Sequence, residues 1–132
     1  GFLLARMISE KKFRRNLMKI CAQPLSEEDL QGFWQLINAN NGLAVFHKLI
    51  GYMSERRQFR SRWVGALQQT SRPLCLIDGV EDPISGAHMV TRYRELVGKQ
   101  PITELPGVGH YPQVEAPALV LQAFRSFMAD LT

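Results

Sequence analysis

Apolar residues recur with helical spacing through the first seventy residues of the chain. In "LSEEDLQGFWQLI" they fall at i, i+3, i+4 and i+7, as Leu30, Phe33, Trp34 and Ile37. Such spacing places one apolar stripe along a helix. Ser26 followed by Asp29 forms an N-cap pair, and "NANNG" at 38–42 ends the helix. The same spacing recurs over 13–20, 46–53 and 59–67, so the pattern predicts an all-helical segment over 1–70.

The period changes after "TSRP" at 70–73. "PLCLIDG" at 73–79 is a short continuous apolar run, as in a strand of a parallel sheet, and "PITEL" at 101–105 is a second, less uniform one. A helix closed by Gly98 lies between them, and a last helix follows over 120–128. The order strand, helix, strand, helix over 71–132 predicts an α/β class with a parallel sheet. Two strands do not make a stable sheet alone, so we expect further strands upstream or in a partner.

Two chemically active side chains follow these two strands. Asp82 lies a few residues after the first strand, and His110 lies in "PGVGHYPQVEAP" after the second. Because the carboxyl ends of parallel strands share one edge of a sheet, we expect the two side chains to meet there. A carboxylate that accepts a hydrogen bond from one imidazole nitrogen leaves the other nitrogen to take a proton from a nucleophile or water. Gly109 and Gly107 would let this loop turn tightly.

Structural roles compete with these chemical ones. His110 could instead bond a backbone carbonyl or cap the region of the next helix, and Asp82 could open a turn, since Asp-Pro commonly does so. Glu115 could orient His110, yet its place just ahead of the last helix favours an interaction with the helix dipole. Asp78, at the end of the first strand, is a second candidate acid.

Composition and charge limit the classes of protein to which the chain can belong. A chain of 132 residues with 45% hydrophobic and 21% charged residues is typical of one modest globular domain. It has no apolar run near the roughly 20 residues that span a bilayer, so we predict no transmembrane segment. The first 71 residues carry 11 basic and 5 acidic side chains, against 5 and 7 in the rest. Clusters such as "KKFRR" and "SERRQFRSR" are interleaved with apolar residues, which indicates solvated helix faces and no nucleic-acid partner. We expect Arg56 and Arg57 to form surface salt bridges.

Cysteines and histidines indicate no metal site. Cys21 and Cys75 lie in apolar contexts without short spacing, which favours buried free thiols and a reducing intracellular compartment. His47 and His88 have no partners at metal-ligand spacing. The aromatic and Met side chains of the helical segment are expected in the core, although some could line a pocket: Phe33, Trp34, Phe46, Tyr52, Met53 and Trp63. The chain opens at Gly1 without a cap or turn signal, which we interpret as part of a longer protein.

Two stretches carry a resemblance to a known family. "PLCLIDGVEDPI" and "PGVGHYPQVEAPALVLQAFRSFM" together resemble the C-terminal end of the α/β-hydrolase fold, where a late strand delivers an acid and the last loop a histidine. "LSEEDLQGFWQLINANNGLAVFHKLIGYMSERRQFRSRWVGAL" looks like the lid helices of the haloalkane-dehalogenase and epoxide-hydrolase branch, most of all those of mesoderm-specific-transcript-like hydrolases. The resemblance implies that Asp82 is the triad acid and His110 the general base, with no cofactor.

The same resemblance implies a fold and a function. The fold would be the C-terminal part of an α/β-hydrolase fold, two parallel strands with helices over 71–132, preceded by a helical lid over 1–70. The function would be hydrolysis of an ester, epoxide or carbon-halogen bond in a small apolar substrate. The chain contains no Gly-x-Ser-x-Gly or aspartate nucleophile elbow, which in the family precedes the lid, so we expect the chain alone to be inactive. The alternative is a truncated, non-catalytic interaction module that self-associates through its exposed core surface.

Overall fold

A computed structural model describes residues 9–98 and 100–131. The start of the predicted helical segment, residues 1–8, lies outside the described residues. The chain is mostly helical with two parallel strands, compatible with an α/β class. In chain order the elements are α2 (Glu10–Met18), α3 (Glu27–Asn38), the 3-10 helix η1 (Ala39–Val45), α4 (Phe46–Leu49), α5 (Tyr52–Gln58), α6 (Arg60–Gln69), β1 (Leu76–Gly79), α7 (Ala87–Val97), β2 (Ile102–Leu105), α8 (Pro112–Glu115) and α9 (Pro117–Ala129).

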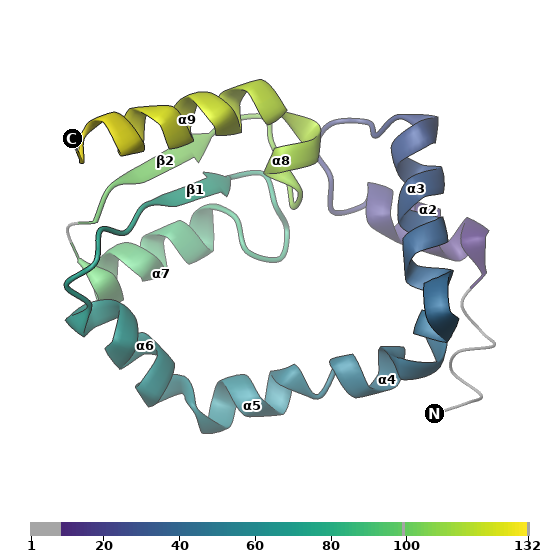
Figure 1. Cartoon of the computed structure of the whole chain (residues 1–132), viewed down its shortest axis with the longest axis horizontal. Coiled ribbons are helices and arrows are strands. Elements are labelled where there is room, and N and C mark those ends of the chain that lie inside the picture. The colour runs from purple at the N-terminus through teal and green to yellow at the C-terminus, as the bar shows by residue number, and fades with distance from the viewer. Residues whose placement is uncertain (1–8, 99, 132) are drawn as a thin grey trace.

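The two strands form a small parallel sheet with a helix on each face. Leu76 pairs with Ile102 at one end and Gly79 with Leu105 at the other. Helix α9 lies along one face of the sheet and α7 along the opposite face (Figure 1). The predicted order of strand, helix, strand, helix is confirmed, although β1 begins at Leu76, later than the apolar run suggested. This order carries both strand ends, with the loops that follow them, to the same edge of the sheet.

Helices α2 and α3 form a pair whose start and end signals lie in the sequence. The Ser26 hydroxyl accepts a hydrogen bond from the backbone N–H of Asp29 at 3.0 Å, so the predicted N-cap of α3 is confirmed. Arg14 of α2 forms ion pairs with Glu10 and Glu27, which joins the two helices. Helix α3 ends at Asn38, and the chain then turns through left-handed backbone at 40–41, which asparagine tolerates.

Helices α4 to α6 run as an arch from the α2–α3 pair to the sheet (Figure 1). The expected stripes over 46–53 and 59–67 lie on three short helices, because the helical hydrogen bonds are interrupted by a turn at 50–51 and the backbone of Phe59 leaves helical geometry. The expectation of core burial is wrong for most of the large apolar side chains of this arch, which are exposed: Phe46, Leu49, Ile50, Tyr52, Met53, Phe59, Trp63 and Leu67. Arg56 lies over the Tyr52 ring, and neither Arg56 nor Arg57 forms the expected salt bridge within the described ranges.

The buried apolar core is small and lies beside the sheet and the loop that carries His110. Its members among the described residues are Leu17, Leu25, Val90, Leu105, Val108 and Ala123. Val90 of α7 is fully buried, and Ala123 of α9 packs on the other side. Over residues 9–98 and 100–131, none of the helices combines the length and apolar character that crossing a membrane requires.

Candidate functional site

The loop after β1 holds the Asp82 carboxylate in a ring of donors. Its Oδ1 accepts the backbone N–H of Ile84 at 2.8 Å, and its Oδ2 accepts the backbone N–H and the hydroxyl of Ser85 at 3.0 and 2.6 Å. The Asp82 side chain is only 4% exposed. Burial alone would raise the pKa of Asp82, but these donors and His110 outweigh it and hold the pKa below its ordinary value. Asp82 is therefore a carboxylate at neutral pH.

The loop after β2 brings His110 to this carboxylate. His110 Nδ1 lies 2.7 Å from Asp82 Oδ2, and the backbone N–H of His110 donates to the carbonyl of Ile20 at 2.9 Å. An ionised Asp82 can only accept, so Nδ1 carries a proton, and in the neutral ring Nε2 carries the lone pair. Nε2 has no hydrogen-bond partner within residues 9–98 and 100–131. The two predicted site residues thus meet at one edge of the sheet, in the geometry that general-base chemistry uses; their catalytic role stays a prediction.

Two glycines allow three backbone segments to stack beneath this pair. A Cβ on Gly109 would lie 2.5 Å from the backbone nitrogen of Ala22 and 2.7 Å from the carbonyl oxygen of Ile20. A Cβ on Gly79 would overlap the carbonyl oxygen of Gly109. Gly109 therefore serves close packing of the backbone, while Gly107, with φ at 72°, supplies the left-handed turn.

Glu115 joins two distant parts of the chain beside His110. Its carboxylate accepts four backbone N–H groups, those of Ala22, Gln23, Gly109 and Tyr111, at 2.7, 2.9, 2.9 and 3.0 Å. These donors outweigh burial, which acts in the opposite direction, and lower the pKa of Glu115. Glu115 ends α8 and turns toward these amides, so the expected interaction with the dipole of the last helix is not what its contacts show.

Asp78, the second candidate acid, forms no hydrogen bond or ion pair with His110 in the described part of the chain. Its side chain lies on β1, the residue is 8% exposed, and its Oδ2 is buried without a hydrogen-bond partner in the described part of the chain. Burial, with Asp82 and Glu104 nearby, raises the pKa of Asp78. Of these two carboxylates, Asp82 is the one that accepts a hydrogen bond from His110.

An apolar pocket of about 480 Å³ opens beside the pair. Tyr111, whose ring meets the His110 ring edge-on at 4.9 Å, and Ile84, which donates to Asp82, both line it. The remaining lining residues come mainly from α2 and the segment after it: Lys12, Phe13, Asn16, Leu17, Ile20 and Phe46. The pocket therefore shares residues with the loops that hold the histidine and the acid.

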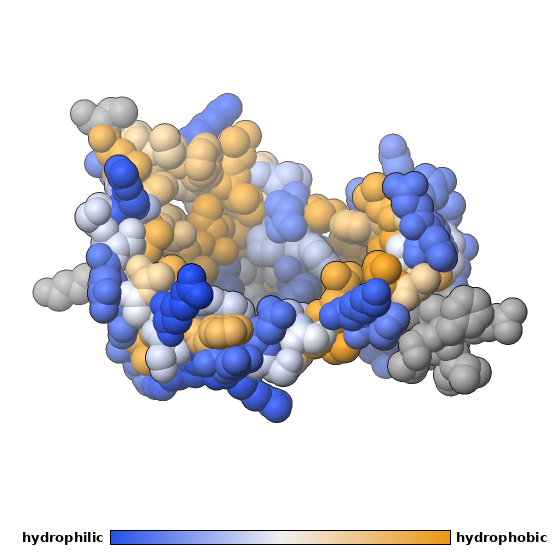
Figure 2. Space-filling model, turned by 60° about the horizontal axis from the view of Figure 1, so that its bottom comes forward, coloured by the Kyte–Doolittle hydropathy of each residue, from blue (hydrophilic) through white to orange (hydrophobic). Residues whose placement is uncertain are grey.

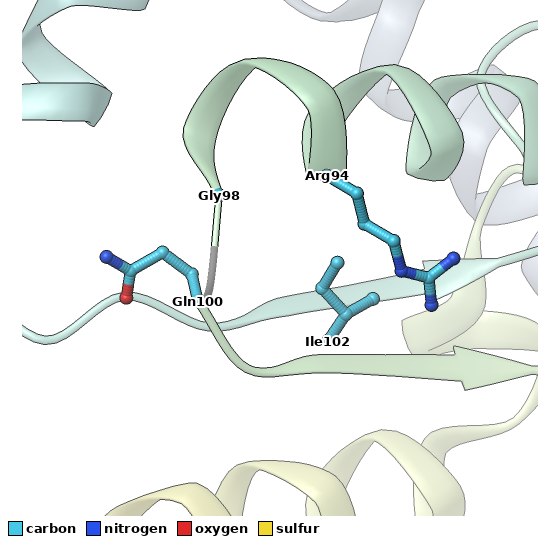
Figure 3. Close-up of a pocket in the computed structure, with 4 residues that line it drawn as sticks. All are labelled: Arg94, Gly98, Gln100 and Ile102. Atoms are coloured by element: carbon cyan, nitrogen blue, oxygen red, sulfur yellow. The ribbon is translucent and has the colours of Figure 1, made fainter.

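A second pocket, of about 450 Å³, lies at the other end of the sheet, where α7 ends and β2 begins. Arg94, Gly98, Gln100 and Ile102 line it, and in Figure 3 the Gln100 side chain points away from Arg94. Arg94 already forms an ion pair with Glu104. None of the predicted site residues lies there.

Other reactive groups do not extend the site. The Cys21 thiol has its pKa raised to about 11 by burial and by the negative charge of Glu115 and Asp82, so it stays protonated and is a poor nucleophile. Cys21 and Cys75 are both free thiols. Within the ranges that the structure describes, no three His, Cys, Asp or Glu side chains gather as metal ligands.

The chain is similar over nearly its whole length to larger proteins. It is 38% identical over 132 residues to a Mycobacterium tuberculosis protein named "Putative hydrolase LipZ", a match that covers 98% of this chain and 46% of that protein. It is 33% identical over 131 residues to the mesoderm-specific transcript protein of Mus musculus and 32% identical to the human homolog protein, covering 96% of this chain and 39% of each. The similarity supports a hydrolase-like family.

These matches also limit what the similarity shows. The chain spans less than half the length of the curated relatives it matches. No protein-family model matches the chain, and no solved structure matches it either. The branch of the family and the activity of a whole protein are therefore matters for proposal.

Sequence reasoning missed one part of the site. The segment 20–23 contacts the histidine loop through the carbonyl of Ile20 and the side-chain amide of Gln23, and both partners in that loop lie more than eighty residues away. Those partners, the His110 N–H and the Gly107 carbonyl, are backbone groups, which are the same in every non-proline residue, so no residue pattern marked this contact.

Proposed function

We propose that the chain is the helical lid and the C-terminal part of an α/β hydrolase, with His110 as general base and Asp82 as the acid that orients it. The observation that carries the proposal is the 2.7 Å contact between His110 Nδ1 and the buried, ionised Asp82. The similarity to hydrolase-named proteins supports the same class of reaction. In this division, residues 1–70 form the lid and residues 71–132 the core part.

His110 would act through its second ring nitrogen. With Nδ1–H bonded to Asp82, Nε2 is free to take a proton from a nucleophile or from water, and Asp82 stabilises the imidazolium that forms. A serine nucleophile would give an acyl-enzyme and an aspartate nucleophile an alkyl-enzyme ester; water then attacks either one and releases the product. The nucleophile would come from a segment outside these 132 residues.

The substrate would be a small apolar molecule with an ester, epoxide or carbon-halogen bond. The pocket beside the pair is lined largely by apolar side chains from α2, the arch and the two loops, so it could bury an alkyl or aryl group away from water. Its contact with Tyr111 and Ile84 would place the reacting bond near His110. We propose no cofactor or metal for this reaction.

The test begins with the coding region directly upstream of the Gly1 codon. We expect the frame to continue and to encode a strand, a glycine-flanked Ser or Asp turn, and a helix. The extended protein is then assayed with a nitrophenyl ester, an aryl epoxide and a haloalkane. His110→Ala should lower kcat/KM by about 10²–10⁴-fold, the usual contribution of a general base.

The matched control is His47→Ala, because His47 is exposed on α4 and forms no hydrogen bond with Asp82 in the described part of the chain. It should leave kcat/KM unchanged. The proposal fails if the frame opens at Gly1, or if the extended protein retains its turnover after His110→Ala. Where the glycine-flanked turn is present, the residue at its tip distinguishes acyl from alkyl chemistry.

A second candidate function is a non-catalytic interaction module, and one specific observation favours it. Large apolar side chains are exposed along the arch and on α9, among them Leu121, Phe124 and Met128. In Figure 2 apolar surface borders the hollow between the two ends of the molecule. Such a surface favours self-association. Light scattering and hydrophobic-dye binding test it: a monodisperse monomer that binds no dye would argue against the module.

A further inference from the structure

The Glu115 carboxylate lies where two backbone segments meet. From one side, Ala22 and Gln23 donate their N–H groups; from the other, Gly109 and Tyr111 donate theirs. N–H groups cannot bond to one another, so segments that face each other with donors need an acceptor between them. One carboxylate, with two oxygens and about four lone-pair positions, meets this need.

Further bonds of the same two segments fix the backbone on both sides of His110. The backbone N–H of His110 donates to the Ile20 carbonyl at 2.9 Å. The side-chain amide of Gln23 donates to the Gly107 carbonyl at 2.8 Å. Three successive backbone N–H groups, those at 109, 110 and 111, are thereby held to segment 20–23 or to Glu115. The Cα of His110 has little freedom left, so this backbone sets the direction of its Cα–Cβ bond, from which the ring reaches Asp82.

We propose that Glu115 is a positioning residue that locks His110 to the segment 20–23, so that this segment controls the hydrogen bond between His110 and Asp82. The proposal rests on the proposed function for its catalytic meaning, but the contacts themselves do not. Ile20, whose carbonyl holds His110, lines the apolar pocket together with Tyr111. A ligand in that pocket therefore touches both sides of the lock, which couples occupancy of the pocket to alignment of the histidine.

The charge of Glu115 is what makes the lock specific. Three of the four donors converge on Oε2 and one on Oε1, so both oxygens are needed. A glutamine has the same shape but offers one oxygen, and its NH₂ would face an N–H group. Glu115→Gln therefore removes the lock without leaving a void. Glu81→Gln is the matched control, because Glu81 is exposed and precedes Asp82 directly in the chain, and no hydrogen bond or ion pair of its carboxylate is found in the described part of the chain.

The first measurement needs no variant. Amide hydrogen exchange of the full 132-residue chain is followed by NMR at Ala22, Gln23, Gly109 and Tyr111. We expect the four amides to exchange as one group, at least about tenfold slower than unprotected loop amides, as charge-assisted hydrogen bonds predict. Exchange of Ala22 and Gln23 at the rate of an unstructured peptide would overturn the proposal.

The second measurement compares the variants through the low-field proton resonance of His110 Nδ1–H. We expect Glu115→Gln to broaden or abolish this resonance and to speed exchange of the four amides by about tenfold or more, while Glu81→Gln keeps both as in wild type. An unchanged resonance and unchanged exchange in Glu115→Gln would overturn the lock. If Glu115→Gln does not fold, the wild-type exchange pattern decides.

These outcomes separate the lock from the hydrolase function. If the lock is wrong, the NMR results fail while His110→Ala still abolishes turnover of the extended protein. If the hydrolase function is wrong, turnover survives His110→Ala while the exchange pattern and the Nδ1–H resonance stay as predicted.

Discussion

Replacing Asp82 by asparagine tests how the candidate site is held together. The carboxylate accepts from Ile84 through one oxygen, and from Ser85 and His110 through the other. Asparagine keeps the shape but has one oxygen and one NH₂ group. If its oxygen faces His110, its NH₂ meets the Ile84 N–H; if it faces Ile84, its NH₂ meets donors of Ser85 and His110. At least one buried donor is left without an acceptor in either orientation.

The size of the effect follows from these contacts. A hydrogen bond to a charged group contributes about 1.5–3 kcal/mol, and an unsatisfied buried donor costs about 1–3 kcal/mol. Since the Asp82 side chain is 4% exposed, solvent cannot replace the lost acceptor. We therefore expect Asp82→Asn to lower the free energy of unfolding at neutral pH by about 3 kcal/mol.

The effect should depend on pH in a defined direction. The folded pKa of Asp82 lies below its unfolded value, so its contribution to stability is present above about pH 3.9 and is lost as the pH falls through the folded pKa. Asparagine has no such titration. The difference in unfolding free energy between wild type and Asp82→Asn should therefore be constant near neutral pH and shrink below about pH 4.

Urea unfolding, followed by circular dichroism and tryptophan fluorescence, measures both quantities. Asp130→Asn is the control, because Asp130 is exposed at the end of α9 and its loss should change stability by less than about 0.5 kcal/mol. The reasoning is refuted if Asp82→Asn stays within about 0.5 kcal/mol of wild type, or if the gap does not narrow on acidification.

Three further predictions follow from single residues. Asp78→Asn should raise stability by about 1 kcal/mol near neutral pH, because burial raises the pKa of Asp78 and penalises its charge; in urea titrations the gain should vanish below about pH 4. Gly109→Ala should cost about 1–3 kcal/mol, since its Cβ meets backbone atoms, whereas Gly32→Ala, with open space on a helix, should stabilise slightly in thermal unfolding. The purified 132-residue chain should show no ester or epoxide turnover that depends on His110; a robust, His110-dependent rate would contradict the proposed missing nucleophile.

Local signals in the sequence were sufficient for most helices and for the order of elements. Ser26 and Asp29 cap α3 as predicted, and Gly98 ends α7 with φ at 86°. These features depend only on neighbours in the chain. The spacing of apolar residues was less reliable over 46–67, where it predicted helical stripes and core positions. The segment forms three short helices, α4, α5 and α6, and side chains such as Trp63 are exposed, because burial depends on surfaces that lie elsewhere in space.

The part of the candidate site that follows from the order of the strands could be predicted from the sequence. Parallel strands bring the loops after them to one edge, which was enough to pair Asp82 with His110. The sequence raised an orienting role for Glu115 but favoured a helix-dipole role instead, because the partners that decide the matter are backbone amides, two of them more than ninety residues away. A carboxylate that bonds backbone has no partner residue whose type could reveal it.

Hydrogen bonds to two carboxylates hold the loops of the candidate site together, so we expect these loops to lose their structure when the carboxylates are protonated. Asp82 and Glu115 each accept four hydrogen bonds, and donors lower the pKa of both. Both contributions are therefore lost in the same direction, as the pH falls below the unfolded values of about 4. Carboxylates also contact α3, since Glu27 pairs with Arg14 and Asp29 accepts from the Ser26 hydroxyl, but the backbone bonds of the helix and the Ser26 cap on the Asp29 N–H involve no carboxylate. In amide exchange on acidification, protection at Gly109 and Ala22, corrected for intrinsic rates, should disappear before protection at Leu30 of α3; simultaneous loss would show that the site and the helix unfold as one unit.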